Sequence, residues 1–98
     1  MTEPRGKSLV RARILVSGRV QGVAYRAFTR QEAVRRNLLG GVRNLDDGRV
    51  EVEVEGEKES IADLIEALKE GPPLARVDDL QLTWSAASGQ YKDFRIWH

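Results

Sequence analysis

The stretch "GGVRNLDDGRVEVEVEG", residues 40–56, carries the period-two alternation of a β-hairpin. From Val50 to Glu55 valine and glutamate alternate, so that the valines share one face of a strand. Asp47-Gly48 is a typical dipeptide of tight hairpin turns, because glycine accepts the positive φ that such turns require. The stretch therefore predicts two antiparallel strands, the first containing residues 42–44, with the glutamates on a solvated face beside arginines of neighbouring strands.

A helix is predicted on each side of this hairpin. On the carboxyl-terminal side, the run that begins at Glu57 has apolar residues at helical spacing and ends at Gly71-Pro72-Pro73. Those apolar residues are Ile61, Leu64, Ile65 and Leu68. On the amino-terminal side, residues 24–37 contain neither glycine nor proline. Asn37 is a suitable stop, because asparagine tolerates the left-handed conformation.

Alternating apolar residues predict the first strand at 10–16, the fourth at 77–84 and a short last strand at 94–96. The resulting order, strand, helix, strand, strand, helix, strand, is the ferredoxin-like split βαβ arrangement of the α+β class. Right-handed crossovers then place both helices on one face of an antiparallel sheet with four or five strands. We expect a single domain over residues 10–98, preceded by a flexible tail over residues 1–9.

Composition narrows the possible functions. A chain of 98 residues suits one domain, and its net charge of +1 favours neither nucleic acid nor an anionic membrane as partner. The hairpin strands also lack the exposed aromatics of an RNA-binding sheet. Cysteine is absent and His98 is the single histidine, which excludes disulfides and thiolate nucleophiles. With no apolar run at the amino terminus, we expect a cytoplasmic protein. We also expect it to be a monomer.

The stretch "SGRVQGVAYR", residues 17–26, joins the first strand to the first helix. Such a connection directs backbone N–H groups into one concavity, and the helix N-terminus adds positive potential there. Gly18 and Gly22 permit the required backbone conformations, while Arg26 offers a planar fork that matches two phosphate oxygens. The alternative is a tight connection followed by a solvated arginine. Neither the ending of a P-loop nor the spacing of a dinucleotide fingerprint is present.

"GRVQGVAYR" and the hairpin stretch resemble the two signature blocks of the acylphosphatases, small enzymes that hydrolyse carboxyl–phosphate anhydrides. The resemblance extends from Arg11 to Ile96. It implies hydrolysis of an acyl phosphate to a carboxylate and inorganic phosphate, which would compete with the substrate, without metal or cofactor. The chain departs from the family pattern at positions that affect packing and substrate fit, namely Tyr25 for phenylalanine, Arg36-Asn37 for Leu-Gly, and Gly41 for a bulkier residue.

The resemblance also assigns roles to residues. It implies that Arg26 and a stretch of backbone hold the phosphate, and that Asn44 holds the attacking water. The backbone stretch comprises Arg19, Val20, Gln21, Gly22, Val23 and Ala24. Taken without the resemblance, Asn44 is more typical of turn chemistry, because its side chain can bond the nearby backbone.

Hydrolysis of an acyl phosphate needs no strong acid to protonate the leaving group, because the conjugate acid of the leaving carboxylate has a pKa of about 4. Positioning and electrostatic stabilisation of the phosphoryl group are then sufficient.

Two other functions remain open: a non-catalytic phosphate-binding regulatory domain, and a module of a carbamoyl-transferring enzyme. Trp84, Trp97 and Tyr91 either flank the acyl group or pack structurally. The adjacent Asp78-Asp79 pair points to opposite strand faces and is assigned to a turn or edge.

Overall fold

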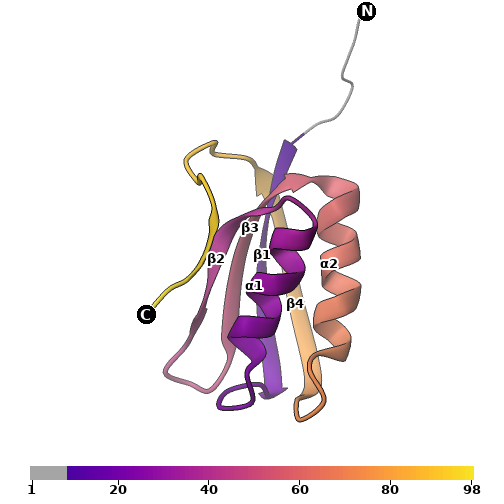
Figure 1. Ribbon diagram of the computed structural model, residues 1–98, viewed down its shortest axis with the longest axis vertical. Helices are drawn as coiled ribbons and strands as arrows, with labels where there is room; N and C mark the ends of the chain where they lie inside the picture. The colour runs from indigo at the N-terminus through magenta and orange to yellow at the C-terminus, as the bar shows by residue number, and fades with distance from the viewer. Residues whose placement is uncertain (1–8) are drawn as a thin grey trace, which may run out of the picture.

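The computed structural model describes residues 9–98, which form five strands and two helices in one α+β unit (Figure 1). In chain order the elements are β1 (Leu9–Arg19), α1 (Tyr25–Arg35), β2 (Leu39–Asn44), β3 (Val50–Glu57), α2 (Lys58–Glu70), β4 (Arg76–Ala86) and β5 (Phe94–Ile96). Both helices cover the same face of the sheet (Figure 1). The ferredoxin-like order that the sequence predicts is confirmed.

The sheet has the strand order β4-β1-β3-β2-β5. The pairs β1–β4, β1–β3 and β2–β3 are antiparallel, as expected. β5 differs, because it runs parallel to β2 and makes the sheet mixed. The chain leaves β4 at one edge and crosses to the free edge of β2, where it must run back in the direction of β2 (Figure 1).

Several boundaries differ from the sequence prediction, among them those of β4, which spans Arg76–Ala86 instead of 77–84, and the end of α1 at Arg35. β1 begins at Leu9, which the sequence assigned to a tail; residues 1–8 of that predicted tail lie outside the described residues. The strand also continues past a bulge at Ser17/Gly18, where a side chain on Gly18 would collide with the backbone of β4. α1 starts one residue late because Ala24 has a left-handed φ of 64°. Asn37, with φ of 58°, follows the helix as predicted.

The core lies between the helices and the facing side of the sheet. Val50, Val52 and Val54 are fully buried there, together with the apolar stripe of α2. That stripe is Ile61, Leu64, Ile65 and Leu68, the set that its spacing predicts. Within residues 9–98, no helix combines the length and the apolar character needed to span a membrane.

The opposite sheet face carries interleaved arginines and glutamates, but the glutamates are less solvated than the sequence suggests. Glu51 is only 3% exposed, because Arg13 and Arg43 each approach its carboxylate to 2.6 Å. Burial alone would raise the pKa of Glu51, yet the hydrogen bonds from the two arginines outweigh it and lower the pKa. Glu55 is also buried, since it accepts hydrogen bonds from Ser88 and Gly89 in the connection that follows β4.

Tyr25, at the start of α1, is joined to the end of α2. Its hydroxyl donates a 2.6 Å hydrogen bond to the carbonyl oxygen of Leu68, and both side chains are buried. Carbonyls in the last turn of a helix lack intrahelical partners, so this bond satisfies one of them. Burial raises the pKa of Tyr25, so the hydroxyl remains a donor at neutral pH.

Replacing Tyr25 with phenylalanine, the usual family residue, should lower the free energy of unfolding by about 1 kcal/mol, because a buried carbonyl loses its partner. Urea denaturation measures this difference. The control is Tyr91→Phe, which removes only a part-buried contact with Arg11 and should cost less. An unchanged unfolding midpoint for Tyr25→Phe would show that the bond contributes nothing.

Candidate active site

The loop between β1 and α1, residues 20–24, has a backbone shaped for anion binding. Gly22 and Ala24 both have positive φ, 75° and 64°, and an ordinary residue stands between them. Alternation of this kind turns successive N–H groups toward one concavity. Val20 and Val23 are buried and fix the loop to the core. Arg19 is the last residue of β1 and pairs with Arg76, so it lies at the border of the loop.

The backbone N–H groups of residues 21–24 are available as donors to a ligand. Among residues 9–98, no acceptor is bonded to the N–H groups of residues 21–24. The loop leads directly into α1, whose N-terminus adds partial positive charge. Arg26, in the first turn, is half-buried and forms no ion pair with the described carboxylates, unlike Arg36 and Arg43. These groups together suit a bound oxyanion.

Asn44 is the last residue of β2 and lies opposite Val50, on the sheet face that the helices cover. Its Oδ1 is buried and has no hydrogen-bond partner within the described part of the chain. Buried polar atoms are nearly always bonded, so an oxygen left without a protein donor calls for an explanation. The loop reaches this strand end: the side-chain Nε2 of Gln21 donates to the carbonyl of Leu45, at 2.8 Å. The structure thus brings the two signature blocks together.

A cavity of about 310 Å³ opens beside the loop. Its walls include Val20, Gly22, Ala24 and Arg26 on one side and Ile96 and His98 on the other. The sequence did not indicate these last two residues, because a three-residue strand does not disclose which partner it pairs with. β5 brings them to the site by pairing with β2 and by the hydrogen bond from Arg30 to the carbonyl of Phe94.

The three aromatic residues considered for the acyl group lie elsewhere. Trp97 covers Gly41, where its ring occupies the space of a side chain, and Arg43 stands 5.5 Å from the ring centroid. Tyr91 packs against Trp97 on the same face. Trp84 lies on β4 beneath Lys58. The structure therefore favours their packing role, and Trp97 compensates for the small residue at position 41.

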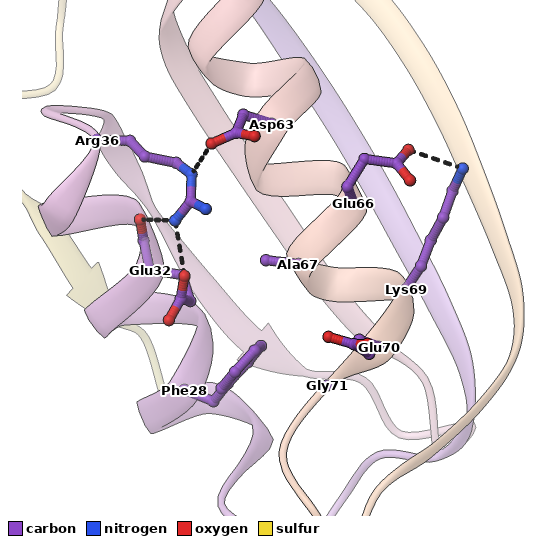
Figure 2. Close-up of a pocket in the computed structure, with 9 residues that line it drawn as sticks. All are labelled: Phe28, Glu32, Arg36, Asp63, Glu66, Ala67, Lys69, Glu70 and Gly71. Carbon is purple, nitrogen blue, oxygen red and sulfur yellow. Dashed lines mark hydrogen bonds and ion pairs between the residues drawn. The ribbon is translucent and has the colours of Figure 1, made fainter.

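A larger groove runs between the two helices (Figure 2) and contains none of the predicted site residues. Most of its charged groups bind one another: Arg36 lies 2.7 Å from Glu32 and 2.8 Å from Asp63, and Lys69 pairs with Glu66. Arg36, which departs from the family pattern, thus links the helices. From Leu9 onward, no group of three or more histidine, aspartate or glutamate side chains is arranged to hold a metal ion.

Comparison with known proteins agrees with this geometry. A family model described as Acylphosphatase matches residues 12–96. The chain belongs to the acylphosphatase family. A curated Acylphosphatase from Anaeromyxobacter sp. (strain Fw109-5) is 49% identical over 90 residues, which cover 92% of this chain and 97% of the relative. Like the relatives that carry this name, the chain is a hydrolase that acts on acyl phosphates.

Solved acylphosphatases share the fold. The crystal structure of acylphosphatase from Bacillus subtilis superposes with a TM-score of 0.88 at 42% identity, over 91% of this chain and 99% of that chain. A similar unit occurs in a longer protein: full-length HypF matches with a TM-score of 0.84 at 33% identity, over 96% of this chain but only 12% of that one.

Proposed function

We propose that the loop of residues 20–24 and Arg26 hold the phosphoryl group of an acyl phosphate, while Asn44 orients the attacking water. The N–H groups of residues 21–24 and the guanidinium of Arg26, none of which has a protein partner within residues 9–98, support the first assignment. The single observation that carries the proposal is the buried, unbonded Oδ1 of Asn44. A domain that only binds phosphate has no use for a polar group that orients a water.

The reaction proceeds by attack of water oxygen on phosphorus, opposite the bond to the acyl oxygen. That P–O bond breaks, its electron pair leaves with the carboxylate, and the protons of the water pass to phosphate oxygens or solvent. Because a carboxylate is a stable anion, with a conjugate-acid pKa of about 4, no general acid is required. The loop and Arg26 balance the charge on the phosphoryl oxygens, which in phosphoryl transfer is the main catalytic requirement.

Asn44 fits the remaining task. An amide does not remove a proton at neutral pH, but its oxygen accepts a hydrogen bond from water and its NH₂ donates one. No donor among residues 9–98 is bonded to Oδ1, so a water would not have to displace a protein group to donate a hydrogen bond to it. Holding the water near the line of attack lowers the activation barrier, because the entropy lost in orienting the water is lost on binding and not in the reaction step.

Inorganic phosphate should act as a competitive inhibitor of acyl phosphate hydrolysis, because product and substrate present the same oxyanion to the loop. It should also raise the melting temperature of the protein, with stabilisation of about 2.7 kcal/mol at a phosphate concentration one hundred times Kd. Benzoyl phosphate as substrate and differential scanning calorimetry measure the two effects. Non-competitive inhibition, or a rate that falls when a chelator is added, would contradict the proposal.

A further inference from the structure

The side chain of Gln21 makes contacts that the proposed phosphate cradle does not need. Its Nε2 donates to the carbonyl oxygens of Leu45, at 2.8 Å, and Arg49, at 2.9 Å. A glutamine amide has two N–H donors, so both are engaged. The two carbonyls flank the turn between β2 and β3, which is itself closed by the 2.8 Å bond from the N–H of Leu45 to the carbonyl of Arg49.

These contacts join two segments that the sheet leaves apart. β1, which leads into the loop, and β2, which ends in Asn44, do not pair with each other; each pairs with β3. Val16 and Asn44 are both opposite Val50, on its two sides. Their backbones are therefore separated by two strand spacings, about 10 Å. No ladder hydrogen bond sets the distance between the phosphate loop and the end of β2.

Asn44 immediately precedes one of the carbonyls that Gln21 binds. Leu45 is the first residue of the turn, so a shift of its carbonyl moves the adjacent asparagine as well. Gly48, at the tip of the turn, has a φ of 95°, and a Cβ added there would contact none of the described residues, so this side of the tip faces open space. The two hydrogen bonds from the Gln21 side chain, called the Gln21 clamp from here on, thus tie this turn to the loop.

We propose that the Gln21 side chain is a positioning residue that fixes the turn directly after Asn44 against the phosphate-binding loop, and so sets the distance between water and phosphorus. This inference rests on the proposed roles of the loop and Asn44. It assigns to Gln21 a task separate from its backbone, which belongs to the phosphate cradle. Because misplacement by about 1 Å can cost 10²-fold in rate, the Gln21 clamp acts on turnover.

Gln21→Met keeps the length of the side chain and removes both donors. We expect kcat for benzoyl phosphate to fall by about 10- to 100-fold, while the inhibition constant of inorganic phosphate stays nearly unchanged. Gln21→Glu should lower kcat further, because it sets a carboxylate oxygen against two carbonyl oxygens. Its negative charge also weakens phosphate binding, so the phosphate inhibition constant is compared for Gln21→Met alone. The matched control is Gln31→Met, at an exposed position of α1, which should leave kcat as in the parent.

A double-mutant cycle separates positioning from a structural role. In an Asn44→Ala background, Gln21→Met should cause little further loss of kcat, because the group that it positions is already gone. Independent losses that multiply would overturn the inference, as would a lowered melting temperature with unchanged kcat. A phosphate inhibition constant that rises in step with the loss of kcat would overturn it too, since Gln21 would then shape the cradle. If Asn44→Ala itself kept full activity, the proposed role of Asn44 would fail instead.

Discussion

Arg26→Ala should lose both substrate binding and turnover, with kcat/KM for an acyl phosphate lower by about 10³-fold. In the proposed assignment the guanidinium contacts phosphoryl oxygens in the bound substrate and in the transition state, so its removal should affect KM and kcat together. Arg26 is available for this task because no described carboxylate pairs with it. Steady-state kinetics over a range of substrate concentrations measure the two parameters separately.

Two further variants isolate the contribution of Arg26. Arg26→Lys should restore little activity, because an ammonium group cannot make the two-pronged contact that a guanidinium makes with phosphate. Arg35→Ala removes an exposed arginine of the same helix, which is paired with Glu32, and should leave the kinetics as they are in the parent. If Arg26→Ala had the kinetics of the parent, the loop would not be the phosphate site.

Most of the fold follows from local patterns in the sequence. The valine alternation of β3 and the apolar stripe of α2 each require one buried face, and burying both gives the layered arrangement. The direction of β5 does not follow, because three residues carry no signal for parallel or antiparallel pairing. The burial of Glu51 and Glu55 also depends on partners distant in sequence: arginines from two other strands, and the connection after β4.

The candidate site is predicted in part. Glycines and an arginine at a strand-to-helix connection indicate an anion site, and the positive φ of Gly22 agrees with that expectation. The sequence cannot show that the Gln21 side chain reaches the β2–β3 turn, since this contact spans 24 and 28 residues of chain. The same limit applies to Ile96 and His98, which enter the cavity only because β5 pairs with β2.

Asn44→Ala should leave phosphate binding nearly intact while kcat falls by about 10²-fold or more. The reason is that an oriented water contributes chiefly in the transition state, whereas the loop and Arg26 contribute in the ground state as well. Asn44 is half-buried at the end of a strand, so folding must be checked by far-UV circular dichroism. The control is Asn37→Gly, which changes the second residue after α1, keeps its left-handed backbone accessible and should not alter kcat.

The most direct test of the division between phosphate cradle and water-orienting asparagine is the single-turnover rate of Asn44→Ala at saturating benzoyl phosphate. The variant must first be shown to bind phosphate by its increase in melting temperature. We expect a slow turnover in a protein that phosphate still stabilises. A folded variant that hydrolyses the substrate at the parental rate would contradict this expectation and leave Asn44 with only a structural role beside the turn.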